Sequence, residues 1–361
     1  MAWTYGVYET ATGRMVAPVQ PSDCSWTRKL DNKGTGSFTF KVHDPSSYPG
    51  QSPQVLFMED EHTIVAIWDD KHSAYAGVIE ETAYDWGRGE ITVQTREVRA
   101  LFETRFTGRP DNYGPEGWDF LVDGTIGAGV QALAARATGH GPGYSLPIVP
   151  DDGPGAGGAW RREINYYEAI TIEDLFQEAE ALGCYIDFNP DLTADGDLVW
   201  VLVTALDLDR GVQPIVVGAP NSPVVAFSTR RSSMDRASGV IALGEGSGKD
   251  QQHGAAWGAL GTVARDRTIS LGDEKEPAQL VTAAQVEQAE IRNPALKWSL
   301  SLRMGGETAL RPWLVRCGRT LEIHTPDDPY LIDGPRDKVV LSLSGDTSDV
   351  VTVEVTDPDD S

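Results

Sequence analysis

In the first third of the sequence, runs with strand-like patterns of apolar residues are separated by turn-forming residues. Phe38, Phe40 and Val42 lie on one side of an extended chain, and Thr39 and Lys41 lie on the other. This is the two-residue period of a strand with one buried face. Six β-rich runs are separated by Gly, Asp, Asn and Pro, which favour turns: 24–42, 54–60, 62–70, 74–82, 90–95 and 96–105. The pattern predicts a sheet in this part of the chain.

One of these runs is apolar at every position. Ile64 to Trp68 contains no polar residue, so we expect this strand to be covered on both faces. A further strand is predicted at Trp3 to Tyr8, followed by a turn at Thr12 and Gly13. The sheet therefore needs other elements to pack against it.

Two helices are predicted in the middle of the chain. The first spans Ile126 to Thr138, with apolar residues three and four apart, and ends at Gly139. The second begins at Thr171 in T-I-E-D, which is similar to a capping box, and stops at Gly183. The predicted buried stripe of the second helix is Ile172, Leu175, Phe176, Ala179 and Leu182. Residues 139–160, rich in Gly and Pro, are predicted to form an irregular loop.

Strand signals dominate the second half of the chain. The predicted strands are 184–188, 198–204, 224–229, 238–243, 253–260, 262–271, 297–303, 313–324, 338–344 and 350–355. A short helix is predicted to open at Thr282 in T-A-A-Q, to contain Val286, and to end at Asn293 before Pro294.

Composition shifts divide the chain into three predicted parts. A break rich in Gly, Pro, Asp and Asn at 107–117 marks the first boundary. We predict a β-rich domain at 1–106, an inserted α/β domain at 107–221 and a second β-rich domain at 222–361 that contains one short helix and an acidic tail. The predicted fold class is α+β, mostly β.

The N-terminal stretch resembles one family, the minor tail proteins of siphophages that infect actinobacteria. Their homologues form the baseplate or tail-tip hub. The resemblance rests on a pattern of fold positions and includes no catalytic signature: Trp26, Arg28, Leu30, Gly34, Gly36, Ser37, Phe38, Ala76, Gly77, Val78, Ile79, Val98, Leu101, Phe102 and Arg105. The elements that follow have the same order as in the family: a helix ahead of R-x-Y-x-x, then a second helix, then paired strands.

The resemblance implies a structural subunit of the bacteriophage virion, located at the tail tip. Two β-rich barrel or sheet domains of each subunit would form a tube-like ring around the inserted domain, in a homotrimer. The implied partners are the tail tube or distal tail ring protein, the tape-measure protein and tip or receptor-binding proteins, with DNA present only in transit. We expect no enzyme activity, because the resemblance includes no catalytic signature, and we expect no cofactor.

Net charge and apolar runs limit the function further. The chain of 361 residues carries 54 acidic and 30 basic residues, a formal net charge of −24, which opposes wrapping of nucleic acid. The acidity fits colloidal solubility, or an acidic lumen that repels DNA if the chain lines a DNA exit path. No apolar run approaches the roughly 20 residues of a membrane span and no signal peptide is present, so we expect neither anchoring nor secretion.

Candidate sites for chemistry are incomplete in every case. G-E-G-S-G-K at Gly244 to Lys249 lacks the earlier Gly and the following Ser or Thr of a phosphate loop, and we expect a turn there. Ser145 in G-Y-S-L-P lacks the second Gly of a nucleophile elbow. Glu80 and Glu81 are adjacent on a strand and should point to opposite faces, which is poor geometry for an acid and base pair. We therefore predict no catalytic residue.

Metal and disulfide signals are equally incomplete. Asp207 and Asp209, near Gly211, lack the spacing of a calcium loop. The same spacing is missing from a second group, Asp191, Asp195 and Asp197. The six His residues show no zinc-binding spacing. The three Cys residues are far apart and odd in number, so we expect small buried hydrophobes and no disulfide framework.

Two alternatives to the tail-tip hub stay open. The first is a distal tail ring protein, which is structural but hexameric, and copy number separates it from a trimeric hub. The second is a tail-associated cell-wall hydrolase whose active site only the fold assembles, and peptidoglycan turnover tests it.

Overall fold

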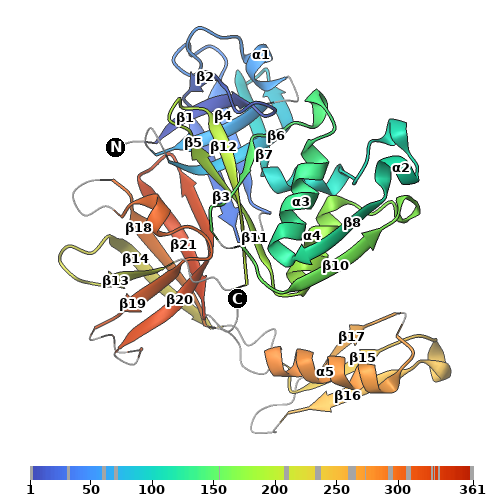
Figure 1. Cartoon of the computed structure of the whole chain (residues 1–361). Helices are drawn as coiled ribbons and strands as arrows, with labels where there is room; N and C mark the ends of the chain where they lie inside the picture. The colour runs from blue at the N-terminus through green and yellow to red at the C-terminus, as the bar shows by residue number, and fades with distance from the viewer. Residues whose placement is uncertain are drawn as a thin grey trace. The chain divides into compact units, whose positions relative to one another are not determined.

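The computed structural model describes most of the chain. It covers residues 3–30, 33–58, 62–68, 72–153, 155–206, 211–231, 237–258, 266–272, 274–291, 296–305, 310–326, 328, 330–331 and 334–357. Two compact units are present: residues 1–227 with 300–355 form unit 1, and residues 228–299 with 356–361 form unit 2. The chain leaves unit 1 within β14 (Val224–Arg231) and returns within β18 (Leu296–Arg303) (Figure 1).

Strands supply most of the regular structure. The remaining strands are β1 (Thr4–Glu9), β2 (Met15–Val19), β3 (Asp23–Lys29), β4 (Thr35–Lys41), β5 (His62–Ile67), β6 (Ser73–Asp85), β7 (Glu90–Glu97), β8 (Phe120–Thr125), β9 (Ile148–Pro150), β10 (Ala159–Ile164), β11 (Tyr185–Leu192), β12 (Leu198–Ala205), β13 (Val212–Val216), β15 (Gly239–Leu243), β16 (His253–Trp257), β17 (Asp266–Ser270), β19 (Thr320–His324), β20 (Pro335–Asp346) and β21 (Val350–Thr356). The α-helices are α1 (Pro53–Phe57), α2 (Pro115–Trp118), α3 (Ile126–Thr138), α4 (Ile172–Ala181) and α5 (Pro277–Ile291). The 3₁₀ helices are η1 (Val98–Thr104), η2 (Pro110–Asn112), η3 (Pro142–Tyr144), η4 (Tyr166–Glu168), η5 (Gly248–Asp250) and η6 (Pro312–Leu314).

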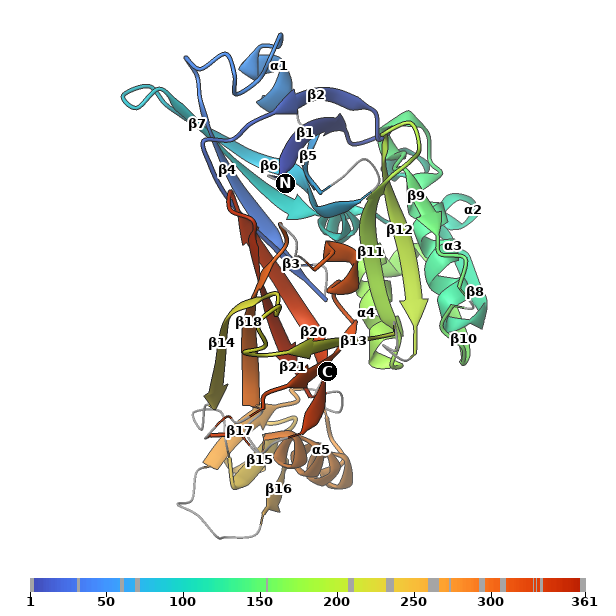
Figure 2. The same ribbon diagram turned by 90° about the vertical axis from the view of Figure 1, so that its left-hand side faces the viewer.

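One large sheet runs through unit 1. Its order is β14-β18-β21-β20-β3-β4-β7-β6-β5-β1-β2, with β19 also paired to β20 and β13 paired to β19. Strand β3 pairs antiparallel with both β4 and β20, so strands from the two ends of the sequence lie side by side (Figure 2). Among the described strands no sheet closes into a barrel. The mostly β, α+β class is confirmed, and the ring and the three-domain division stay predictions.

The predicted strand faces are confirmed except at the strand ends. Phe38 and Phe40 of β4 are fully buried, and Ile64, Val65 and Ala66 of β5 are fully buried on both faces. Val42 and Trp68 lie beyond the ends of these strands and are half-buried. The strand alternation read from the sequence therefore identified the core side of this sheet.

Helices α3 and α4 have the predicted bounds within one or two residues. The side chain of Thr171 accepts a hydrogen bond from the N–H of Asp174, and the carboxylate of Asp174 accepts one from the N–H of Thr171, which completes a capping box. Helix α3 packs against β12, and α4 packs against β11 and η1. Phe102 of η1 contacts Phe176 of α4 and Phe188 of β11, with ring centroids 5.2 and 5.4 Å away. Leu182 is a correction to the predicted stripe, because it caps the helix and is 51% exposed.

Two β-rich runs of the N-terminal stretch are helical. Residues 53–57 form α1, because Ser52 caps the helix and Pro53 begins it, and both residues favour those positions. Residues 98–104 form η1 and end the hairpin of β6 and β7. Met58 of the run at 54–60 caps this helix, and Glu59 and Asp60 lie outside the described residues.

Three predictions further along the chain are wrong in detail. The loop at 139–160 contains β9, which pairs in parallel with β12, and the start of β10. The strand predicted at 313–324 is limited to β19, because η6 and a turn precede it. Helix α5 begins at Pro277, so Thr282 is inside it and its hydroxyl bonds to the carbonyl of Ala278. The predicted helix end, Asn293 with Pro294, lies outside the described residues.

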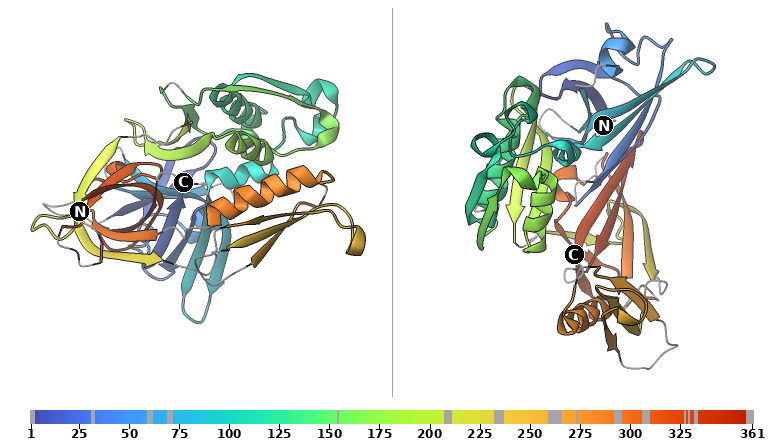
Figure 3. Two further views of the ribbon diagram at one scale, coloured as in Figure 1. Left: turned by 90° about the horizontal axis from the view of Figure 1, so that it is seen from below. Right: turned by 90° about the vertical axis from the view of Figure 1, so that its right-hand side faces the viewer.

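Unit 2 is a small sheet covered by one helix. The sheet has the order β16-β15-β17, and α5 packs along it (Figure 3). Val240, Ala242 and Ala256 of the sheet meet Leu280 and Ala284 of the helix in a core separate from that of unit 1. Val286 faces away from this core and is 55% exposed.

Candidate functional site

A buried ionic network lies at the centre of unit 1. Arg28 of β3 is 2% exposed and donates from one Nη to Asp187 Oδ1 at 2.6 Å and to Asn189 Oδ1 at 2.7 Å. Its Nε lies 3.5 Å from Glu97 Oε1, and the other oxygen of Glu97 accepts from the N–H of Gly34 at 2.7 Å. The network therefore ties β3, β7 and β11 together through side chains.

Strand alternation brings these groups to one place. Asp187 and Asn189 are two residues apart on β11 and so share a face, which is the face turned toward Arg28. Gly34 has no room for a side chain, because an added Cβ would lie 2.1 Å from the carbonyl oxygen of Thr27. The close approach of the backbone at Gly34 allows its N–H to reach Glu97.

Burial and charge act in opposite directions on these groups. Burial disfavours the charged form of Arg28, but Asp187 and Glu97 outweigh it and raise its pKa. Burial raises the pKa of Glu97 to about 7, although Arg28 and the N–H of Gly34 favour the carboxylate. The protonated form of Glu97 is therefore favoured by its burial, the largest of these influences.

A polar cleft of about 360 Å³ lies beside the network. It is lined by His72, Asp151, Asn189, Asp191, Val203, Trp313, Arg316 and Arg319. His72 stacks on Trp313 with ring centroids 3.9 Å apart, and Arg316 reaches Asp191 at 3.5 Å. Burial and the nearby Arg28 lower the pKa of Arg316.

The charged groups of the cleft are balanced. Its described lining residues include no Ser, Thr, Cys or Tyr, and the two carboxylates are accompanied by two guanidinium groups that hold charge and donate hydrogen bonds. The side chains of Asn189 and Asp191 are also partners of Arg28 and Arg316. The arrangement is suited to holding segments of the chain together.

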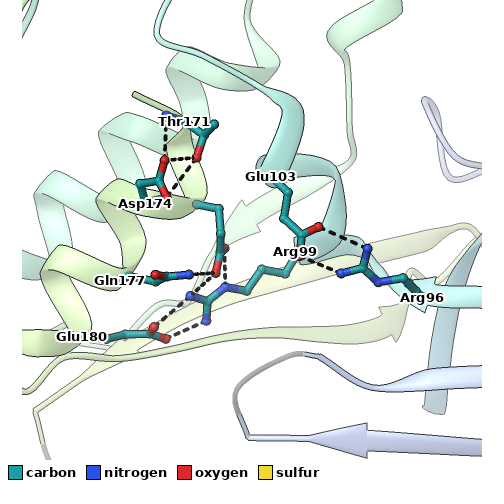
Figure 4. Close-up of polar contacts among 8 residues, drawn as sticks. Arg96, Arg99, Glu103, Thr171, Asp174, Gln177 and Glu180 are labelled. Atoms are coloured by element: carbon teal, nitrogen blue, oxygen red, sulfur yellow. Dashed lines mark hydrogen bonds and ion pairs between the residues drawn. The ribbon is translucent and has the colours of Figure 1, made fainter. Parts of the chain in front are cut away.

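A second buried network joins η1 to α4. Arg99 donates to Glu173 at 2.7 and 3.0 Å and to Glu180 at 2.6 and 2.8 Å (Figure 4). Arg99 and Glu173 are 2% and 4% exposed. Burial opposes the charge of Arg99, but Glu180 and Glu173 raise its pKa. Since Glu97 and Arg99 are two residues apart, both networks meet at the end of β7.

The candidate nucleophile, acid pair and phosphate loop lie apart. Ser145 is exposed beside η3. A β-bulge between Ile79 and Glu81 interrupts the strict alternation expected for Glu80 and Glu81, and both are exposed. Gly244 to Lys249 connects β15 to β16 and contains two glycines with positive φ, as expected of a turn.

The candidate metal ligands are scattered as well. Among the described residues no group of three His, Cys, Asp or Glu side chains could hold a metal ion. Asp207 and Asp209 lie outside the described residues, and Asp191 faces Arg316. The His residues occupy separate places: His43 and His253 are exposed, His62 bonds to the Leu56 carbonyl, His72 stacks on Trp313, His140 bonds to the Thr107 carbonyl, and His324 lies on β19.

The buried cysteines are confirmed as small hydrophobes. Cys24, Cys184 and Cys317 are free and buried, and burial raises the pKa of Cys24 and of Cys184 to about 11. No described helix is long and apolar enough to cross a membrane.

Sequence reasoning found one end of the central network and missed the other. Arg28 was among the fold positions of the resemblance, but Asp187 and Asn189 were not singled out. Their signal is the segment Y-I-D-F-N, in which two polar residues occupy alternate positions of an otherwise apolar strand. Such a pair is expected to need buried partners.

Comparison with known proteins identifies a fold class. No protein-family model and no curated protein matches the sequence. The structure is similar to the 43 kDa tail protein of prophage MuSo2 from Shewanella oneidensis, with a TM-score of 0.58, 14% identity and 99% of each chain covered. It is also similar to the tail protein from Neisseria meningitidis MC58, with a TM-score of 0.51, 14% identity, and 99% of this chain and 97% of that one covered.

A third similar structure comes from a secretion system. It is an E. coli protein described as a component of the type VI secretion system, with structural similarity to the T4 bacteriophage tail proteins gp27 and gp5. The TM-score is 0.50 at 11% identity, with 94% of this chain and 74% of that one covered. The fold is therefore one found in phage tail and baseplate proteins, and at these identities the likeness concerns the fold alone.

Proposed function

We propose that this protein is a structural subunit of a bacteriophage tail tip, the hub that closes the end of the tail tube and joins it to tip or receptor-binding proteins. The observation that carries the proposal is the match to two tail proteins over almost the whole of both chains. A match of this extent accounts for both units of the chain.

The candidate site supports a structural role. Arg28 and Arg99 are buried and pair with carboxylates from other segments, Arg28 with Asp187 and Arg99 with Glu173 and Glu180, so they serve to fix the segments of unit 1. A subunit of a tail must transmit force between its neighbours, and buried ion pairs hold strands and helices in one arrangement because breaking them leaves a charge unpaired.

We further propose a homotrimer that lies on the path of DNA. The net charge of −24 suits a surface that DNA passes without binding, because like charges repel. The tail tube or distal tail ring, the tape-measure protein and tip proteins are the proposed neighbours.

Copy number in the virion tests this proposal. Quantitative mass spectrometry of purified particles, with the major tube protein as internal standard, is expected to give three copies per tail. Six copies would favour the distal tail ring. Absence of the chain from purified particles would overturn both structural assignments and direct attention to an assay of peptidoglycan turnover.

A further inference from the structure

Within the described part of the chain, the hairpin of β6 and β7 carries a strand edge with which no other strand pairs. Strand β7 pairs with one side of β6 from Gly77 to Asp85. On the other side, β5 pairs with β6 only between Ser73 and Val78. Among the described strands none pairs with that side of Glu81–Asp85, which is called the open edge here. The hairpin extends past the neighbouring strands of unit 1 (Figures 2 and 3).

An unpaired edge offers alternate backbone N–H and C=O groups to an incoming strand. Five residues in extended conformation are enough for a short added strand. Sheet edges of this kind are used for recognition by β-augmentation, in which backbone hydrogen bonds supply affinity and side chains supply specificity.

The two faces of the open edge differ in chemistry. Glu81, Ala83 and Asp85 share one face, and all three are exposed. Their partners on β7 are Gln94, Thr92 and Glu90, so this face is polar and acidic. The only described cation paired with it is Arg88, 3.5 Å from Asp85, and both side chains are more than half exposed, which makes that pair weak.

The opposite face is apolar. Thr82 and Tyr84 lie across from Val93 and Ile91, which are buried. The hydroxyl of Thr82 donates to the carbonyl of Phe57 at the end of α1, so α1 covers the inner part of this face. Tyr84 is 54% exposed beyond it.

The hairpin turn adds an exposed aromatic side chain. Trp86 directly follows β6 and is 84% exposed. Trp and Tyr side chains are enriched where proteins meet, because they supply a large contact area with little loss of conformational freedom. A strand beside the open edge would lie next to both aromatic residues.

We propose that the open edge of β6 docks a strand of a partner protein in which apolar residues alternate with Lys or Arg. The apolar residues would cover Tyr84, and the basic residues would lie across from Glu81 and Asp85, because opposite charges in neighbouring strands stabilise pairing. A second copy of this chain is a poor occupant for this edge, since the same edge would bring the same acidic residues. A basic strand can dock here whatever assembly the chain belongs to.

Two designed peptides test the proposal on the full chain. The probes are Lys-Val-Lys-Val-Lys-Val-Lys and the same peptide with Glu in place of Lys. We expect the basic peptide to slow amide hydrogen exchange within residues 79–86 and to shift the fluorescence of Trp86. The acidic peptide should bind about tenfold more weakly, since two or three cross-strand charge pairs change sign.

A charge-swapped variant provides the decisive comparison. In E81K/D85K the preference should reverse, so that the acidic peptide binds more tightly than the basic one. The variant E116K/D195K has the same change of net charge at exposed positions outside the hairpin, and it should keep the original preference. Failure of the basic peptide to bind, equal binding of both peptides, protection elsewhere in the chain, or reversal by both variants would overturn the proposal. None of these results depends on the copy number of the chain in virions.

Discussion

At the scale of single residues, the fold depends on charges that have been removed from water. Arg28 and Arg99 are each 2% exposed and each meets two acidic side chains. Transfer of an unpaired charge to the interior is costly, so each cation is tolerated only with its partners in place. The same residues are therefore sensitive positions for substitution.

Replacement of Arg28 should be strongly destabilising. In Arg28→Met, Asp187 and Glu97 lose their counter-charge while staying buried, so the free energy of unfolding should fall by about 3 to 5 kcal/mol. Arg96→Met is the matched control, because Arg96 pairs with Glu80 and Glu103 at the surface and should cost at most about 1 kcal/mol. Urea denaturation of both variants measures the difference, and equal losses would contradict a special role for the buried network.

The pKa of Glu97 makes stability depend on pH. Its pKa is about 7 in the folded chain against 4.5 as the ordinary value. The folded state therefore holds the proton more tightly, and its contribution is complete below pH 4.5 and lost as the pH rises through 7. The contribution amounts to about 3 kcal/mol.

Glu97→Gln removes this contribution without changing the shape of the side chain. The stability of the natural protein relative to the variant should increase as the pH is lowered from 8 to 5. Denaturant titrations at several pH values measure the two curves. Parallel curves would show that Glu97 titrates normally in the folded protein.

At the scale of elements, the ends of helices and the ends of strands set the local structure. Thr171 and Asp174 cap α4 reciprocally, and Thr125 caps α3 through the N–H of Ala128. Residues Phe176 and Ala179 then bury the inner face of α4. Capping determines where the helix begins, and burial determines which side faces the core.

Removal of the cap on α4 should have a moderate effect. Thr171→Ala leaves the N–H of Asp174 without its side-chain acceptor, so we expect a loss of about 1 kcal/mol in the free energy of unfolding. Thr171→Ser keeps the hydroxyl and should stay close to the natural protein. Thermal and urea denaturation both report the change, and a loss of similar size in the Ser variant would argue against capping as its cause.

At the scale of the whole molecule, the chain contains two units with separate cores. Unit 2 is built around Leu280 and Ala284 of α5 and the sheet of β15 to β17. The core of unit 1 includes Phe176 and Trp200. Because each core is complete in itself, damage to one unit should stay within it.

Paired core truncations test this independence. Leu280→Ala should speed amide exchange in residues 239–258 and 277–288 and leave residues 172–205 unchanged, and Phe176→Ala should do the reverse. Each substitution removes fully buried apolar volume and should cost its own unit about 2 to 5 kcal/mol. Faster exchange in both units of either variant would show that the units unfold together.

Local patterns in the sequence determined the elements but erred where several signals competed. The alternation of Phe38 and Phe40 and the capping residues around α4 predicted strands and helices correctly, because a few neighbouring residues decide those structures. The same reasoning read 54–60 as a strand, although Ser52 and Pro53 begin a helix there. It also placed the start of α5 at Thr282, because a capping pattern inside a helix looks the same as one at its end.

Only the tertiary structure decided which distant residues meet. The sequence by itself determined a mostly β chain with two central helices, three buried cysteines and a strongly negative charge. It could not show that Arg28 pairs with Asp187 across 159 positions, or that none of the described strands pairs with the far side of β6 beyond Val78. Side-chain pairing and strand order depend on the closing of long loops and on burial, which are properties of the folded chain and leave no fixed spacing in the sequence.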